Sequence, residues 1–142
     1  MHFRTATAAD LPELAVLNAA LIRDEGHRNR MTVAELEARM RRFFDQGHVA
    51  VLFSEGERTI GYALYRNDED GVYLRQFFIA EDARRGGRGR QAVQWLCANA
   101  WGGAERVTLQ VLLHNQRGID FWRAVGFADY CLFMERRPVN QA

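Results

Sequence analysis

The stretch Ile-Ala-Glu-Asp-Ala-Arg-Arg-Gly-Gly-Arg-Gly at residues 79–89 joins an apolar strand to a helix. A strand pattern over Val72 to Ile79 enters this loop, and a helical pattern from Arg90 to Trp101 leaves it. The first turn of a helix has N–H groups without intrahelical partners, its dipole favours an anion, and glycine lets the anion approach the main chain. The stretch therefore predicts a receptor for phosphate groups. Four arginines add positive charge there: Arg84, Arg85, Arg88 and Arg90.

Composition limits the class of protein. The chain has 142 residues, 48% of them hydrophobic and 26% charged, so one globular domain over residues 1–142 is expected. A net charge of +1 argues against a general nucleic-acid binder. The amino terminus carries polar Thr7 and Asp10 instead of a long apolar run, so we expect no signal peptide or membrane span, and a cytoplasmic location. Cys97 and Cys131 are too few for a disulfide framework, and no metal cofactor is indicated.

Periodicity and turn signals predict the element order β-α-α-β-β-β-α-β-α-β. Capping boxes at Thr7 and Thr32 predict the starts of the first two helices. The strand over Val72 to Ile79, the helix from Arg90 to Trp101 and the strand over Arg106 to Leu113 form a βαβ unit with parallel strands. Because the earlier hairpins are antiparallel, we expect a mixed sheet and an α/β fold (α+β by some schemes). The remaining strands are expected at residues 2–6, 48–53, 59–65 and 127–134, and the last helix at residues 116–124.

Three kinds of glycine loop that bind phosphate compete for this stretch. A nucleoside-triphosphate loop needs Gly-Lys-Ser or Gly-Lys-Thr, and all 19 basic residues of this chain are arginine, which excludes that kind. A dinucleotide loop lies in the first βα turn, with an acid at the end of the following strand. Here the loop follows the fourth strand, and the next strand ends in Leu113-His114-Asn115 without a carboxylate. The second kind therefore does not fit.

The third kind is the acetyl-coenzyme A loop of the GNAT acetyltransferase superfamily, which Ile79 to Gly89 resembles. The family's core is Arg/Gln-x-x-Gly-x-Gly/Ala, matched by Arg84, Gly87 and Gly89. The stretch from Asn115 to Phe127 resembles that family's later motif, in which an asparagine precedes a helix with an aromatic residue near its end, followed by Gly-Phe. The resemblance implies a GNAT-like mixed sheet of six to seven strands with helices on both faces, splayed open between the two parallel strands.

The resemblance also implies how acetyl-coenzyme A binds as co-substrate. The pantetheine arm would lie in the opening, bonded like an extra strand to the main chain from Phe77 to Ile79, and the pyrophosphate would accept from the N–H groups of Arg85 to Arg90. Asn115 would touch the pantetheine arm or an active-site water, although a helix cap alone explains its position. The residues expected at the co-substrate are Phe77, Phe78, Ile79, Arg84, Arg85, Gly86, Gly87, Arg88, Gly89, Arg90, Asn115 and Trp122.

Direct acetyl transfer to an amine needs a neutral nucleophile, a polarised thioester carbonyl and a proton for the departing thiolate. The resemblance implies that N–H groups at a bulge around Phe78 and Ile79 polarise the carbonyl. Many family members protonate the thiolate with a tyrosine, but this chain has Trp122 there, and an indole N–H only donates hydrogen bonds. Tyr130, Cys131 or water are candidate substitutes. The alternative for Tyr130 and Cys131 is that they pack against the helix.

The general base is also open. The strand before the glycine loop carries no acid, and Arg75 occupies one place where some family members have one. An arginine cannot act as a base at ordinary pH, but it can pair with a carboxylate of the acceptor. We therefore expect a small amine that bears an acidic group, with water relayed through Gln76 or Asn115 taking the proton. The alternative for Arg75 is an internal salt bridge with Asp24 or Glu25.

The segment from Arg23 to Met31 joins the first two helices, which often line the acceptor side in this family. Its Asp24, Glu25 and His27 are candidates to bind a cationic amine, such as an aminoglycoside or a polyamine. The alternative is a solvated turn.

These features favour an acetyl-coenzyme A-dependent N-acetyltransferase acting on a primary amine of a small molecule, with no nucleic-acid or membrane partner. One alternative is a non-catalytic sensor or interaction domain that binds acyl-coenzyme A. Another is an N-acetyltransferase of proteins or peptides. An exposed edge strand over Phe127 to Met134 leaves a homodimer open as the assembly.

Overall fold

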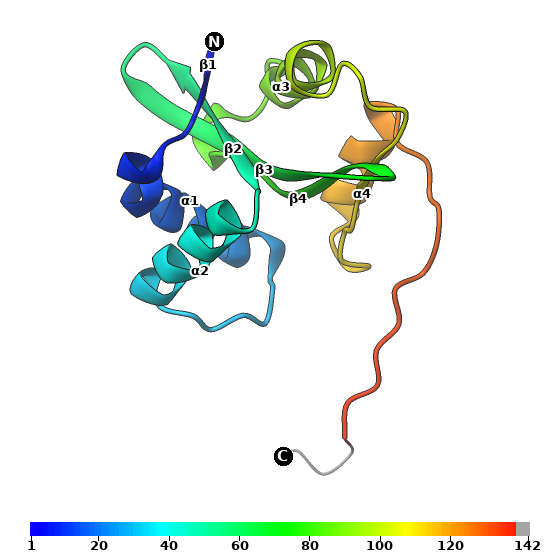
Figure 1. Ribbon diagram of the computed structural model, residues 1–142. Helices are drawn as coiled ribbons and strands as arrows, with labels where there is room; N and C mark the ends of the chain where they lie inside the picture. The colour runs from blue at the N-terminus through cyan, green and yellow to red at the C-terminus, as the bar shows by residue number, and fades with distance from the viewer. Residues whose placement is uncertain (139–142) are drawn as a thin grey trace.

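The computed structural model describes residues 1–138, which contain a five-stranded mixed sheet with helices on both faces (Figure 1). The strand order is β1-β2-β3-β4-β5; the first four strands pair antiparallel with their neighbours, and β5 pairs parallel with β4. The expected fold class and the parallel pair are confirmed. The strands are β1 (His2–Thr5), β2 (Val49–Glu55), β3 (Arg58–Asp68), β4 (Gly71–Ile79) and β5 (Val107–Leu109).

The helices begin where the caps predict them. The Thr32 hydroxyl accepts a hydrogen bond from Glu35 N at 3.2 Å, and the Glu35 carboxylate accepts one from Thr32 N at 2.9 Å. The first helix ends at Gly26, whose φ of 62° suits glycine. No helix within residues 1–138 has the length and apolar character needed to cross a membrane. The helices are η1 (Ala8–Asp10), α1 (Leu11–Glu25), α2 (Val33–Asp45), η2 (Glu81–Ala83), α3 (Arg88–Trp95), the π-helix η3 (Leu96–Ala100) and α4 (Gln116–Ala124).

Two apolar clusters attach the helices to the two faces of the sheet. On one face, Leu14 of α1 and Met40 of α2 are fully buried together with Tyr62 of β3. On the other face, Leu96 of η3 and Phe53 of β2 are fully buried. Burial of apolar surface is the main force that holds such layers together. The loop between β4 and α3 therefore joins two elements that the core holds in place.

A bulge in β4 changes which side chains face which layer. Leu74 pairs with Tyr65 of β3, and Gln76 pairs with the residue just before Tyr65. Arg75 is therefore the extra residue on β4. Leu74 and Phe77 both contact the cluster on the α3 side, although residues three apart in a regular strand face opposite sides. The bulge expected near the end of this strand thus lies in its middle.

The sheet opens between β4 and β5. The two strands pair only over Val72 to Leu74, opposite Val107 to Leu109. From there to Ile79, β4 has no neighbouring strand on that side within residues 1–138, which confirms the splayed pair. The open edge of β4 leads directly into the glycine loop, and α4 stands beside it (Figure 1).

The last predicted strand is wrong. Residues 127–134 form no strand, and β5 occupies only three of residues 106–113, so the described sheet has five strands instead of six or seven. Aromatic and apolar residues favour an extended chain, but a strand also needs a partner. Arg123 of α4 forms an exposed ion pair with Asp129, and the segment after this pair leads away from the sheet (Figure 1). Its large side chains are exposed: Tyr130, Leu132, Phe133 and Met134.

Candidate active site

The glycine loop presents a row of main-chain donors. Arg85, Gly86 and Gly87 adopt φ angles of 71°, 84° and 77°, three successive residues in the left-handed region. Within residues 1–138, no internal hydrogen bond uses the N–H groups from Arg85 to Arg90; the first N–H with a partner is that of Gln91, which bonds Gly87 O at 2.9 Å. Consecutive unpaired N–H groups at a helix start form a concavity that binds anions. The predicted phosphate receptor therefore has the required main-chain geometry.

Two of the four loop arginines hold the loop in shape and do not face outward. Arg84 donates from Nε to Ile79 O at 2.8 Å and forms an ion pair with Asp24 of α1. Arg88 forms an ion pair with Glu55 at the end of β2 and donates from Nη1 to the carbonyl oxygens of residues 83 and 85, at 3.3 and 3.1 Å. Both residues are expected at the co-substrate from the sequence, and their side chains bond to the protein.

The other two loop arginines are exposed. Arg90 donates from Nη2 to Ala124 O at 3.1 Å, which links the start of α3 to the end of α4. The side chain of Arg85 forms no hydrogen bond or ion pair within the described residues. Arg85 is thus the loop arginine whose charge is most available to an anion.

The two signature glycines serve different purposes. Gly87 is the N-cap of α3, and a Cβ there would have open space around it, so only its left-handed φ requires glycine. Gly89 lies inside the first turn, where a Cβ would come within 2.9 Å of Cε1 of Phe121 on α4. Gly87 therefore shapes the donor row, while Gly89 lets α3 and α4 approach each other.

The open edge of β4 exposes the main-chain groups of alternate residues. Ala80 N bonds Ile60 O of β3 at 2.7 Å, so every second residue before it, including Phe78, also points its main-chain groups at β3. The main-chain groups of Phe77 and Ile79 consequently face the opening. Of the three residues predicted to bond the pantetheine arm, Phe77 and Ile79 are placed for it and Phe78 is not.

Helix α4 supplies the other wall of the opening. Asn115 caps this helix, with Oδ1 accepting from Gly118 N at 3.0 Å. Trp122 packs edge-on against Phe77 of β4, with ring centroids 5.1 Å apart. Phe121 stacks on the same Phe77 ring at 5.9 Å. Trp122 thus lies on the helix that packs against β4, and Asn115 caps the start of that helix. Their contact with the co-substrate stays a prediction.

The structure does not bring Tyr130 to this wall. Its ring lies 4.9 Å from the guanidinium carbon of Arg106, and it is 82% exposed. Arg106 immediately precedes β5, and its carbonyl bonds Val72 N at the start of β4. The glycine loop is at the other end of β4, so the structure places Tyr130 near the start of that strand and not at the loop. Cys131 is exposed as well.

The acidic residues at the end of α1 differ in their environment. Asp24 is paired with Arg84, and Nη2 of Arg117 lies 3.6 Å from its carboxylate. Glu25 is partly buried, and this burial, with Asp24 beside it, raises the pKa of the Glu25 carboxyl. The main-chain carbonyl of Glu25 lies 2.8 Å from Nε2 of His114. The carboxylate of Glu25 forms no ion pair within residues 1–138, whereas that of Asp24 does.

The side chain of His27 forms a hydrogen bond within its own loop. Its Nδ1 accepts a hydrogen bond from Asn29 N at 3.0 Å, and the Asn29 side chain in turn accepts from Met31 N at 2.8 Å. This local bonding supports the reading of a solvated turn for His27.

Neither Asp24 nor Glu25 pairs with Arg75, so the alternative of an internal salt bridge with either of them is wrong. Arg75 donates from Nε to Nε2 of His48 at 3.0 Å. Burial, and then the charge of Arg75, lower the pKa of His48, so its ring is neutral and accepts this bond. Gln76, the proposed water relay, accepts at Oε1 from the hydroxyl of Tyr62 at 2.7 Å.

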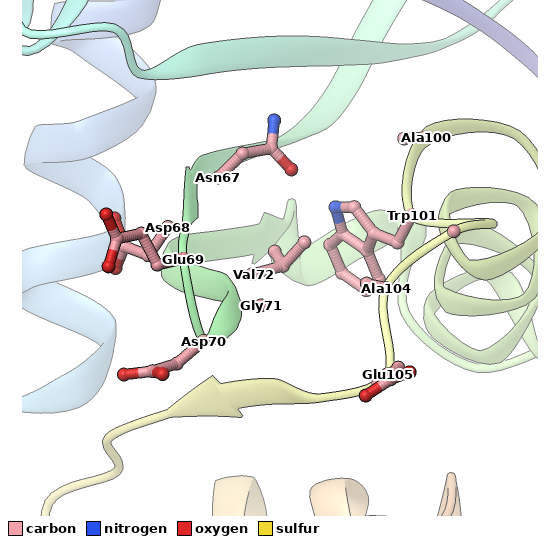
Figure 2. Close-up of a pocket in the computed structure, with 11 residues that line it drawn as sticks. Asn67, Asp68, Glu69, Asp70, Gly71, Val72, Ala100, Trp101, Ala104 and Glu105 are labelled. Carbon is pink, nitrogen blue, oxygen red and sulfur yellow. The ribbon is translucent and has the colours of Figure 1, made fainter.

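Two hollows lie at opposite ends of β4. One, of about 450 Å³, adjoins the start of the glycine loop and is bordered by Ala80 of the loop and Asp24 of α1. The other, of about 410 Å³, lies at the turn between β3 and β4 beside Trp101 (Figure 2). Because β4 runs from the second hollow to the glycine loop, the second hollow lies away from that loop. The second is lined by the carboxylates of Asp68, Glu69, Asp70 and Glu105.

Comparison with known proteins agrees with this geometry. The model of the acetyltransferase (GNAT) family matches residues 18–127, which include the glycine loop and α4. The chain belongs to the GNAT acetyltransferase family. A search of curated proteins found no match.

Solved structures share the fold across nearly the whole chain. A predicted acetyltransferase from Clostridium acetobutylicum, solved with acetyl-CoA, has a TM-score of 0.76 and 16% identity over 96% of this chain and 95% of its own. An aminoglycoside acetyltransferase from an uncultured soil metagenomic sample, in complex with trehalose, has a TM-score of 0.75 and 13% identity over 98% and 96%. An acetyltransferase from Thermus thermophilus has a TM-score of 0.73 and 24% identity over 90% and 88%.

Proposed function

We propose that this protein is an acetyl-coenzyme A-dependent N-acetyltransferase that moves an acetyl group to a primary amine of a small molecule by direct attack. The observation that carries the proposal is the row of unpaired N–H groups from Arg85 to Arg90 beside the opening between β4 and β5. A diphosphate with an extended arm fits such a pair of features. Membership of the GNAT family, and the acetyl-CoA described with the Clostridium structure, support the same ligand.

The open edge of β4 orients the acyl donor. Phe77 and Ile79 turn their N–H and C=O groups toward the opening, where an extended amide-bearing arm pairs with them like a strand. Since Ile79 O already accepts from Arg84, the free acceptor on this edge is the carbonyl of Phe77. An N–H group of this edge polarises the thioester carbonyl as negative charge develops on its oxygen.

We assign the general base to Glu25. The two oxygens of the proposed water relay are already engaged, Gln76 Oε1 by Tyr62 and Asn115 Oδ1 by Gly118 N. The carboxylate of Glu25 has no such partner within residues 1–138, and its raised pKa makes it a stronger base than an exposed glutamate. It takes a proton from the attacking amine as the C–N bond forms and the C–S bond breaks. Trp122 donates a hydrogen bond to the departing thiolate, and water supplies its proton.

Release of thiol from acetyl-coenzyme A across a panel of primary amines tests the activity. We expect turnover with at least one small amine and none without an amine. Binding of coenzyme A without turnover on any amine or peptide would instead support a sensor domain. Turnover on peptides alone would support a protein or peptide acetyltransferase.

Calorimetric titration of coenzyme A tests the donor row directly. In Gly87→Val, a β-branched side chain must adopt the left-handed region at a cost of roughly 1–2 kcal/mol, so the row distorts and affinity falls about tenfold or more. Arg85→Gln removes one exposed charge and is expected to cost no more than that. Gly103→Val is the control, because Gly103 has open space and no left-handed φ. Unchanged affinity in Gly87→Val would contradict the proposed site.

A further inference from the structure

Two arginines surround one aromatic ring on the α2 side of the sheet. The guanidinium carbon of Arg39 lies 5.4 Å from the ring centroid of Phe43, and that of Arg75 lies 4.8 Å from it. Arg39 comes from α2, and Arg75 is the bulged residue of β4. The two positive charges are therefore brought together by elements that the core holds in place.

Both arginines have neutral hydrogen-bond partners. Arg39 donates from Nη2 to Oδ1 of the buried Asn18 at 3.0 Å, and Arg75 donates to the neutral ring of His48. Neither forms an ion pair with a carboxylate within the part of the chain that the structure describes. Each of these bonds satisfies a donor but leaves the positive charge uncompensated.

The environment of Arg39 disfavours its positive charge. Its Nε is buried and has no hydrogen-bond partner within residues 1–138. Burial lowers the pKa of Arg39, and the neighbouring charge of Arg75 lowers it further. Two like charges without a counter-ion disfavour the empty site, and an anion held between the two guanidinium groups removes that penalty.

The position of the pair indicates which molecule carries that anion. Arg75 is followed two residues later by Phe77, whose main-chain groups face the opening for the acyl donor. The pair also lies on the layer of α1 and α2, the side where Glu25 ends α1. An acceptor bound here places its amine near the thioester and a second group near the arginines.

We propose that the acetyl acceptor carries a carboxylate or phosphate group, held between Arg39 and Arg75. This inference rests on the proposed N-acetyltransferase activity and specifies its substrate class. Of the carboxylates expected to bind a cationic acceptor, that of Asp24 is already paired with Arg84 and lies 3.6 Å from Nη2 of Arg117.

Matched acceptors test the proposal. Thiol release is compared for amino acids and their carboxamides, and for phosphoethanolamine and ethanolamine, at equal concentrations of neutral amine. We expect kcat/KM for the anionic member of a pair to exceed that of its neutral counterpart by about 10- to 100-fold, as charge-assisted hydrogen bonds provide, mainly through a lower KM. The two pairs of compounds distinguish a carboxylate from a phosphate acceptor.

Variants assign the effect to the two arginines. Arg39→Gln and Arg75→Gln should each reduce the preference for the anionic acceptor to a few fold. Arg42→Gln is the matched control, because Arg42 is an exposed arginine on the same helix. Coenzyme A titration and thermal unfolding of each variant verify that the donor site and the fold persist. An equal loss of preference in Arg42→Gln would overturn the proposal.

The results distinguish a failure of the anionic-acceptor proposal from a failure of the acetyltransferase proposal. Turnover with equal rates for anionic and neutral acceptors overturns this inference and leaves the acetyltransferase proposal intact. No turnover with any amine overturns both. Calorimetric titration of the coenzyme A complex with the preferred anionic amine is a readout independent of turnover, and Arg39→Gln should weaken that binding by about tenfold or more.

Discussion

Gly89 of α3 lies under the ring of Phe121 of α4, so close that a Cβ at Gly89 would be 2.9 Å from Cε1 of that ring. The ring is not free to move aside, because it stacks on Phe77 and packs edge-on against Trp122. The second glycine of the signature thus holds the two helices that flank the opening at their observed separation.

Gly89→Ala is expected to lower the free energy of unfolding by about 1 kcal/mol. Overpacking a filled contact costs roughly 1–3 kcal/mol, and the higher helix propensity of alanine returns at most about 1 kcal/mol. Urea denaturation measures the change, with Gly103→Ala as the control because a Cβ at Gly103 meets nothing within 4 Å. Equal stability of the two variants would contradict the packing role.

Arg88→Gln should weaken coenzyme A binding by about tenfold, even though the Arg88 side chain bonds to the protein. Its guanidinium ties the loop to Glu55 and to two loop carbonyls, and charge-assisted bonds of this kind hold the donor row in shape. Arg85→Gln, which removes an exposed charge of the same loop, should have a smaller effect that disappears at high salt. Calorimetry at two salt concentrations distinguishes the two roles. A larger loss in Arg85→Gln would show that charge outweighs loop shape.

Much of the fold was predictable from local sequence. The Thr32 capping box, the helix at residues 116–124 and the parallel pair around the glycine loop were each specified by a short pattern with a physical cause. Residues 127–134 have the composition of a strand but no strand, because pairing depends on a partner that composition does not reveal.

The site was predictable at the level of the main chain and less so at the level of side chains. The glycine spacing indicated the donor row, but not that Arg84 and Arg88 would bond the protein, since those partners lie on α1 and β2. Arg39 was missed altogether. A signal was present in Asn18, a polar residue within the apolar stripe of the first helix, which binds Arg39 in the structure.

Stability should fall as the pH drops below about 6.5, the usual pKa of histidine, because of His48. Burial lowers the pKa of His48 in the folded state, so between that lowered value and 6.5 the unfolded chain binds a proton that the folded chain does not. His48→Asn should flatten this part of the stability profile, measured by denaturant unfolding from pH 8 to 5. His2→Asn is the control, because His2 is exposed. An unchanged slope in His48→Asn would remove His48 as the cause.

The homodimer stays a prediction, and its surface is now more specific. Leu132, Phe133 and Met134 are 66, 73 and 80% exposed, an apolar stretch of a kind that monomeric proteins rarely leave uncovered. Light scattering should give twice the chain mass, and Phe133→Ser combined with Met134→Ser should give the monomer mass. Val16→Ser and Val33→Ser, at exposed apolar residues on α1 and α2, form the control. A monomeric wild-type protein would refute the dimer.

Glu25→Gln should lower kcat by about 100-fold or more, as loss of a general base does, and should abolish the rise of kcat/KM with pH that reports ionisation of this carboxyl. The sign of its effect on stability is opposite. Because burial raises the pKa of Glu25, the ionised form is less favourable in the fold than in the unfolded chain, so removing the charge should leave stability at pH 7 unchanged or higher. Asp24→Asn breaks the pair with Arg84 and should instead lower stability. Steady-state rates from pH 5 to 9, with thermal unfolding of both variants, measure the two effects. If Glu25→Gln is inactive and also less stable, Glu25 is a structural residue. If Glu25→Gln is fully active, water and not Glu25 accepts the proton of the amine.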